Sequence, residues 1–170
     1  MLKVLGFLLF VAGTTLMGLS AVASLRERVT CLRGFLGALE LMERELSFNL
    51  TAVPELFSRL ARSAEPPANK FFACCAKGFS NLGERSVEEI WRSALSESRL
   101  PLGEDESETL RSVGQVLGRY DGEGQQAVIM IARESLGRSL VRAESDRERL
   151  SRVYGALGLT GGIFLALIIL

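Results

Sequence analysis

The chain has 170 residues, with 20 basic and 20 acidic side chains, three cysteines and no histidine. A net charge of zero argues against nucleic-acid binding, which needs a clustered excess of lysine and arginine. The lack of histidine removes the commonest general base and a common metal ligand. The length allows one domain of ordinary size together with the two apolar runs at the chain ends.

The first apolar run, residues 4–25, contains no charged side chain. A helix rising about 1.5 Å per residue over this run crosses the roughly 30 Å hydrocarbon core, so we predict a transmembrane helix over residues 1–25. Arg26, Arg28 and Arg33 follow it, and such an excess of arginine marks the cytoplasmic side. Ala21-Val22-Ala23 resembles a signal-peptidase site and leaves cleavage open as an alternative. The run is longer than the roughly 7–15 residues of a signal core, which favours an uncleaved span.

The helix is predicted to continue from the first span to about Asn49, because apolar residues recur every three or four positions. This stripe consists of Leu25, Val29, Leu32, Leu36, Leu39, Met42, Leu46 and Leu50. Glu43, Glu45 and Phe48 fall on other faces of the same helix. Folding alone does not explain a phenylalanine outside the stripe, and binding anchors are often aromatic. We therefore predict that these three residues bind a partner, with packing of Phe48 on the next helix as the alternative.

Two short helices are predicted next. Thr51 is the expected N-cap of the first, whose first turn tolerates Pro54, and Pro66-Pro67 ends it. The second helix is predicted over residues 68–82, with Gly83 as its stop.

Ser86 and Glu89 have the spacing of a capping box and start a fourth helix, in which Trp91 is the expected core anchor. A fifth helix begins with the acidic residues 104–108, which favour its positive N-terminus. A cation or partner site there is the alternative. In this helix Gly114 and Gly118 share a face that would let another helix approach closely.

Residues 120–125 are predicted to form a turn, with Asp121 as cap of the last helix. That helix becomes highly charged over residues 142–152 and leads into the second apolar run, residues 153–170. At about 27 Å as a helix, this run is barely sufficient for a second span. Small residues share one face in each run, and we predict that they pack the spans closely, although small residues without a partner are the alternative. They are Gly155, Gly158 and Gly162 in the second run, and Thr14 and Gly18 in the first.

No enzyme motif is present: the chain contains no G-x-S-x-G, no H-E-x-x-H and no Walker sequence. Cys74 and Cys75 are adjacent, at about 3.8 Å between Cα atoms, which is below the usual disulfide range. With Cys31 the count is odd, so we expect reduced cysteines that pack as small apolar residues; a metal or redox site is the alternative. No cofactor or metal is predicted, and a membrane-bound enzyme without a recognisable motif is the alternative function.

The chain as a whole resembles the stage III sporulation protein AB family. The similarity covers nearly the full length. It rests on MLKVLG at 1–6, AGTT at 12–15, LELMERELSF at 39–48 with Thr51 and Pro54 after it, LGRYD at 117–121 with Gln125, and RVYGALG at 152–158.

Residues and resemblance agree on an all-α fold: a helical bundle domain, residues 26–152, between transmembrane helices 1–25 and 153–170, with the first and last helices continuous with the spans. The resemblance implies a two-pass protein of the mother-cell membrane facing the forespore, with the central domain in the cytoplasm. It implies a non-enzymatic platform subunit of the sporulation channel, similar in its soluble part to the platform proteins of type II secretion and type IV pili. The implied partners are a cytoplasmic ATPase and other channel subunits, and self-association stays open. If residues 1–25 are a cleaved signal, a secreted, tail-anchored protein is the alternative.

Overall fold

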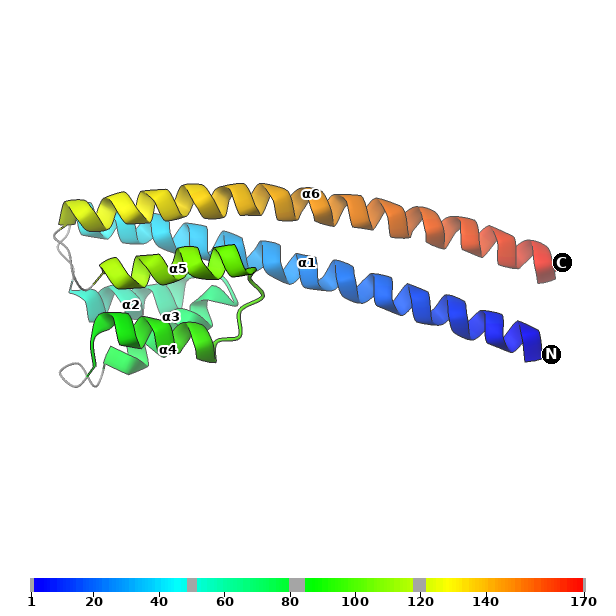
Figure 1. The fold of residues 1–170 in the computed structure, drawn as a ribbon, viewed down its shortest axis with the longest axis horizontal. Helices are drawn as coiled ribbons and strands as arrows, with labels where there is room; N and C mark the ends of the chain where they lie inside the picture. Colours follow the sequence, from blue (N-terminus) through cyan, green and yellow to red (C-terminus); the bar gives the residue numbers. More distant parts are fainter. Residues whose placement is uncertain (1, 49–51, 80–84, 118–121, 170) are drawn as a thin grey trace. The chain divides into compact units, whose positions relative to one another are not determined.

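The computed structural model describes residues 2–48, 52–79, 85–117 and 122–169, with side chains placed for 20–46, 52–79, 85–117, 124–154 and 156. The regular elements in these ranges are helices, so the predicted all-α class is confirmed. They are α1 (Leu2–Phe48), α2 (Val53–Ser63), α3 (Ala68–Gly78), α4 (Val87–Glu97), α5 (Glu104–Val116) and α6 (Gly122–Ile169) (Figure 1).

The chain divides into two compact units. One combines Met1–Glu27 with Arg142–Leu170, and the other is Arg28–Val141. Over the residues with placed side chains, no helix is apolar over a length sufficient to cross a bilayer. Most of residues 1–25 and 153–170 lie outside that range, so the two spans stay predictions.

The core of the Arg28–Val141 unit is a cluster of aromatic rings contributed by α1, α2, α3 and α4. Ring centroids lie 5.3 Å apart between Phe35 and Phe71, 5.9 Å between Phe57 and Phe72, and 4.8 Å between Phe71 and Trp91. Trp91 is 1% exposed and the four phenylalanines are fully buried. Tilted and edge-to-face pairs of this kind each add about 0.5–1.5 kcal/mol beyond the area they bury. The predicted role of Trp91 as core anchor is confirmed.

Trp91 also explains how closely α4 and α5 pack. The indole Nε1 of Trp91 donates a hydrogen bond of 2.8 Å to the Leu110 carbonyl oxygen in α5. A Cβ added to Gly114 would lie 2.3 Å from Trp91 Cδ1, so only glycine fits there. The predicted close approach at Gly114 is confirmed, whereas Gly118 lies outside the described residues.

The helix starts agree with the sequence at α4 and differ at α2. At α4 the Ser86 backbone N–H donates to Glu89 Oε2 at 2.9 Å and the Glu89 N–H donates to Ser86 Oγ at 3.2 Å, which confirms the capping box. At α2 the N-cap is Ala52, with no side-chain hydrogen bond, so the prediction of Thr51 as cap is wrong. A cap at Thr51 would place Pro54 at the third helical position, where a cap oxygen seeks an N–H that proline lacks.

Two other boundaries differ from the sequence-based prediction. Helix α3 ends at Gly78, short of the predicted residue 82, and Gly83 lies outside the described residues. A Cβ on Gly78 would lie 2.6 Å from Ile90 Cγ2, so this helix end packs closely on α4. Helix α6 already starts at Gly122, so residues 122–125 are helical and not part of a turn. The predicted cap Asp121 lies outside the described residues.

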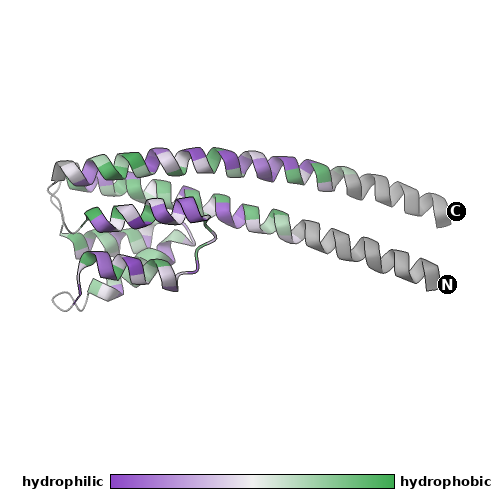
Figure 2. Ribbon diagram, in the orientation of Figure 1, coloured by the Kyte–Doolittle hydropathy of each residue, from purple (hydrophilic) through white to green (hydrophobic). Residues whose placement is uncertain are grey.

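Helix α6 changes character along its length. Ile129, Ala132 and Leu136 are buried in the Arg28–Val141 unit. Beyond this stretch the placed part of the helix is mostly hydrophilic (Figure 2). This agrees with the charged segment that the sequence places at residues 142–152.

Candidate partner-binding surface

The three residues predicted to bind a partner, Glu43, Glu45 and Phe48, lie at the C-terminal end of α1. Glu43 is half-buried and accepts a hydrogen bond from Arg133 Nη1 of α6. Arg133 Nη2 also lies 4.0 Å from Oε2 of Glu40, which is about one turn before Glu43 on α1. Glu43 therefore connects α1 to α6 within the domain, and a partner would meet its carboxylate as part of this ion pair.

Glu45 is 6% exposed and is one of two acidic residues buried in the described part of the chain. Its Oε1 accepts a hydrogen bond of 2.5 Å from Arg59 Nη1 of α2, whose side chain is 45% exposed. A buried carboxylate is tolerated when it is paired, and removing its partner leaves an uncompensated charge. The structure thus gives Glu45 an intramolecular role that the sequence did not reveal.

Phe48 is the last residue of α1, and its side chain lies outside the described range. Partner binding by Phe48 and its packing against α2 therefore both stay predictions.

Sequence reasoning missed a second buried acid, Glu106, which is 1% exposed. Arg28 of α1 reaches it with both Nε, at 3.2 Å from each carboxylate oxygen, and Nη2, at 2.6 Å from Oε1. The Gly103 backbone N–H donates to Glu106 Oε2 at 2.6 Å, so the same carboxylate caps α5. The acidic residues at the start of α5 were predicted to favour its positive N-terminus. Glu106 does this and also forms an ion pair with Arg28 of α1. The only sequence signal was its place at the third position of α5.

Two of the three cysteines in the Arg28–Val141 unit, Cys31 and Cys75, are buried. Burial, together with a smaller effect of the Glu106 charge, raises the pKa of the Cys31 thiol from 9.0 to about 12. Burial, followed by the neighbouring Cys74, also raises the pKa of Cys75. All three cysteines are free. Among the residues searched, no cluster of acidic side chains and cysteines could hold a metal ion.

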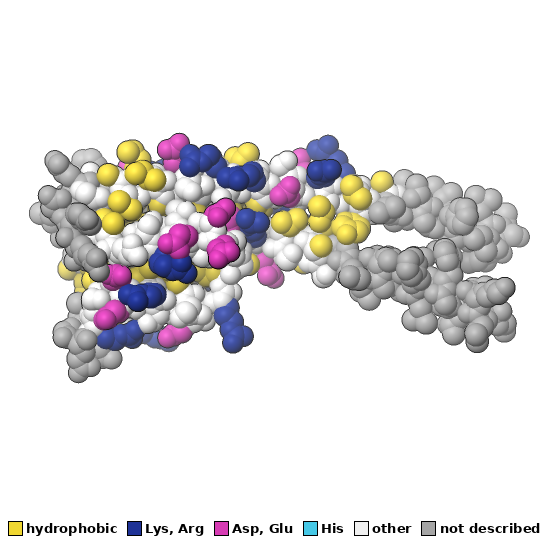
Figure 3. All heavy atoms as spheres, viewed as in Figure 1, with side chains coloured by type: hydrophobic (Ala, Val, Ile, Leu, Met, Phe, Trp, Pro, Cys, Tyr) yellow, Lys and Arg dark blue, Asp and Glu magenta, His cyan; other side chains and the backbone are white. Residues whose placement is uncertain are grey.

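The face of the molecule seen in Figure 3 carries interspersed acidic and basic side chains over α4, α5 and α6. Ion pairs within one helix also occur at the surface, such as Arg92 with Glu88 at 3.2 Å in α4 and Arg138 with Glu134 at 2.8 Å in α6. Exposed pairs of this kind add little stability, about 0.3–0.5 kcal/mol each. This face offers no broad field of one sign that would attract a polyanion.

The residues predicted to pack the spans all lie within the long helices: Thr14 and Gly18 in α1, and Gly155, Gly158 and Gly162 in α6. Their surroundings lie outside the described range, so their role stays a prediction.

Over the residues that the structure describes, the fold is that of an all-α protein whose first and last helices, α1 and α6, are much longer than α2 to α5. Comparison with protein families matches residues 3–170 to the family described as Stage III sporulation protein AB. The chain belongs to this family, which assigns it a role in sporulation. Over 172 aligned residues it is 27% identical to Stage III sporulation protein AB of Bacillus subtilis (strain 168), covering all of both chains. It is also similar to a solved structure of Stage III sporulation protein AB, with a TM-score of 0.67 and 26% identity over 72% of this chain and 98% of that one. The predicted family is confirmed.

Proposed function

We propose that the chain is a non-enzymatic platform subunit of the channel complex that links mother cell and forespore. In this proposal residues 1–25 and 153–170 cross the mother-cell membrane that faces the forespore, and residues 26–152 lie in the cytoplasm. The domain couples a cytoplasmic ATPase to the membrane assembly and to other channel subunits.

The observation that carries the proposal is the double use of α1 and α6. Each helix contains one predicted span, and each also supplies core residues of the Arg28–Val141 unit, such as Leu32 and Leu39 from α1 and Leu136 from α6. No loop separates span from domain in either helix. Helices that belong to both parts suit a protein that passes a mechanical signal between the membrane and a cytoplasmic motor.

Orientation is tested first, because the whole proposal depends on it. Arginines flank the inner ends of both apolar runs, so Glu148 should face the cytoplasm. In a cysteine-free variant carrying Glu148→Cys, a membrane-impermeant thiol reagent should label the protein only after the cells are opened. Ready labelling in intact cells would place the domain on the other side and end the proposal.

We further propose that the ATPase docks at the end of α1, where Glu43, Glu45 and Phe48 lie. The half-buried carboxylate of Glu43 is held by Arg133, so its orientation is fixed before a partner arrives. Glu45 is buried, and its part in docking is to hold this end of α1 against α2 through Arg59. Preorganised groups lose less entropy on binding than free side chains do.

The docking experiment must separate the charge of Glu43 from its structural role. Glu43→Arg alone places two arginines together, whereas Glu43→Arg with Arg133→Glu restores the ion pair in reversed order. Glu108→Arg is the matched control, because it reverses one exposed acidic charge on α5, where Glu108 pairs with Arg111. The full-length variants in detergent are used to pull down the purified ATPase, and circular dichroism reports their fold.

If Glu43 contacts the ATPase, both the single and the double variant should bind about tenfold more weakly, about 1.4 kcal/mol, while Glu108→Arg binds normally. Full recovery of binding in the double variant would show that Glu43 acts only through Arg133. Phe48→Ser is tested by the same pulldown and circular dichroism. If this variant keeps its fold and no longer binds the ATPase, Phe48 takes part in docking. If the variant does not fold, Phe48 packs in the core of the domain.

A further inference from the structure

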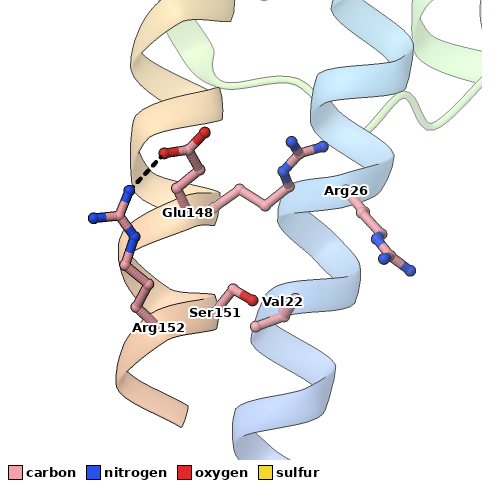
Figure 4. Close-up of a pocket in the computed structure, with 6 residues that line it drawn as sticks. Val22, Arg26, Glu148, Ser151 and Arg152 are labelled. Carbon is pink, nitrogen blue, oxygen red and sulfur yellow. Dashed lines mark hydrogen bonds and ion pairs between the residues drawn. The ribbon is translucent and has the colours of Figure 1, made fainter. Parts of the chain in front are cut away.

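A hollow of about 500 Å³ lies between α1 and α6 in the unit that contains both chain ends. In Figure 4 the guanidinium of Arg26 points away from α6, and Arg152 pairs with Glu148 at 3.0 Å. The charged groups around this hollow therefore do not face one point, as the groups that bind a ligand must. The Arg28–Val141 unit has another hollow between the same two helices, and the residues around it favour one partner.

The hollow in the Arg28–Val141 unit lies beside two large apolar side chains that are exposed to solvent. Met130, which lines the hollow, is 58% exposed, and the adjacent Ile131 is 61% exposed. The hollow has a volume of about 420 Å³, and its lining comes from α1 and α6: Leu36, Gly37, Glu40, Met130, Arg133 and Glu134. Exposed apolar side chains with polar residues around them mark a surface that binds another protein.

The same surface continues across α1. Gly37 is exposed, and a Cβ added to it would meet nothing within 4 Å. Gly37 also lines a hollow of about 380 Å³, together with Leu41 and Arg44 of α1 and with Leu60 and Ala64 of α2. Since Gly37 has no side chain, only the backbone of α1 separates the two hollows. The α1–α6 face comprises Gly37, Leu41 and Arg44 of α1 and Met130, Ile131 and Glu134 of α6.

The side chain of Arg133 shows which residues of α1 and α6 are level with each other. It lies beside both Glu40 and Glu43, so Arg133 is level with the turn of α1 between them. Within this unit the two helices run side by side in opposite directions (Figure 1). Because both helices rise about 1.5 Å per residue, each later residue of α6 is level with an earlier residue of α1.

We propose that the α1–α6 face binds a second copy of the chain, with α6 of each copy lying along α1 of the other. The inference rests on the membrane spans of the proposed function, because two copies with the same orientation in one membrane are related by a two-fold axis along its normal. Since α1 and α6 lead into the spans, such an axis runs along both helices and keeps every residue at its own level. It also makes each contact occur twice.

The charges and apolar side chains of the face are complementary to the same face of a second copy. Glu134 is about level with Leu41, and Ile131 with Arg44, so each helix offers one apolar and one charged side chain within the same turn. In the dimer Ile131 packs on Leu41 of the second copy, and Glu134 forms an ion pair with Arg44 of the second copy. Arg44 is exposed and has no ion-pair partner among the side chains that the structure places. The Glu134 side chain is 74% exposed, and its pair with Arg138 in the same helix, at 2.8 Å, is of a kind that adds little stability and is readily exchanged.

The test measures the mass of the full-length chain in detergent by sedimentation at increasing protein concentration. The wild-type chain should be a dimer at the higher concentrations. In a dimer of Arg44→Glu chains both contacts bring two glutamates together, and in a dimer of Glu134→Arg chains both bring two arginines together. Each variant alone should therefore dimerise at least tenfold more weakly than wild type, because like charges face each other across the contact.

Mixing the two variants is the decisive step. In the mixed dimer the new glutamate of one chain meets the new arginine of the other, and the second contact keeps its native pair, so the mixture should dimerise as wild type does. Recovery by mixing cannot arise from an effect on folding within one chain, and circular dichroism reports the fold of each variant. Arg111→Glu and Glu108→Arg are the matched controls, because they reverse exposed charges of α5 outside the face, and each should dimerise as wild type does.

Three results would overturn the inference: a wild-type chain that stays monomeric, a mixture that does not recover the dimer, and an equal loss of the dimer in the two controls. A monomeric wild-type chain whose binding to the ATPase is lost in Arg44→Glu would assign the face to the ATPase and refute the dimer. Labelling of Glu148→Cys in intact cells tests the spans and their orientation separately. Failure of the dimer and failure of the proposed function are therefore distinguishable.

Discussion

Replacing Gly114 with alanine should destabilise the domain, although alanine is normally the better helix former. Gly114 lies in the interior of α5, directly against the indole of Trp91. An added Cβ would lie 2.3 Å from Cδ1, 2.5 Å from Cγ and 2.9 Å from Nε1 of Trp91. Contacts this short cannot persist, so the indole must move. It is 1% exposed and surrounded by rings of Phe57, Phe71 and Phe72.

Three contributions set the magnitude. Forcing an extra methyl group into a packed core costs about 1–3 kcal/mol. Moving the indole breaks its hydrogen bond to the Leu110 carbonyl, and an unsatisfied buried donor costs about 1–3 kcal/mol. The intrinsic helix preference for alanine over glycine returns about 1 kcal/mol. The middle values give a net loss of about 3 kcal/mol, which is a large part of the 5–15 kcal/mol typical of a folded domain.

The assay is urea unfolding of the full-length chain in detergent, followed by the fluorescence of Trp91, the single tryptophan. Gly137→Ala is the matched control: Gly137 is also inside a helix, and a Cβ there would meet nothing within 4 Å. That variant should be more stable than wild type by about 0.5–1 kcal/mol. Equal stabilisation by both substitutions would refute the argument, because it would show that Trp91 can move aside at no cost.

Three further predictions follow from burial, charge and small residues. The hydrogen bond that the Ser86 backbone N–H donates to the Glu89 carboxylate holds the pKa of Glu89 below 4.5. The stabilisation by the ionised carboxylate is therefore present above pH 4.5 and is lost as the pH falls through the lower pKa of the folded state. Glu89→Gln should remove this part of the acid dependence of the thermal unfolding midpoint. Since burial raises the pKa of Cys31 and Cys75, both thiols stay protonated at neutral pH, and iodoacetamide should modify them only after denaturation, as peptide mass spectrometry would show. Gly158→Leu should reduce disulfide crosslinking between cysteines engineered in the two spans, whereas Leu165→Ala should not, because only the first adds bulk to the small-residue face.

The sequence was most informative where a signal is local. The capping box at Ser86 involves residues three positions apart, and its chemistry does not depend on the rest of the fold. For α1 the sequence predicts a single apolar stripe along one face of the helix, and Phe35 is not one of its residues. In the structure Phe35 is fully buried and contacts Phe71 of α3, whereas the predicted stripe member Leu36 is only half-buried. A helix with neighbours on more than one side buries more than one stripe, and the neighbours are not visible from its own periodicity.

The buried acids could not be predicted for a related reason. Glu45 and Glu106 are buried because arginines reach them, and those arginines lie 14 and 78 positions away in the sequence. Only the folded chain brings such partners together, so a carboxylate with a distant partner and one on a solvated face look identical in the sequence. The same limit applied to Glu43, whose partner Arg133 is 90 positions away.

The three ion pairs together give α1 a fixed position along its own axis. In the Arg28–Val141 unit, α1 is joined to α5 by Arg28 with Glu106, to α2 by Glu45 with Arg59, and to α6 by Glu43 with Arg133. Pairs of this kind add little net stability, because desolvation of the charges offsets much of their attraction. Sliding α1 by one turn, about 5.4 Å, would nevertheless break all of them and leave two carboxylates buried without partners. Apolar stripes alone tolerate such a shift, because their pattern nearly repeats after each turn. The ion pairs therefore select one register, which is the property required of a helix that leads from the domain into a predicted membrane span.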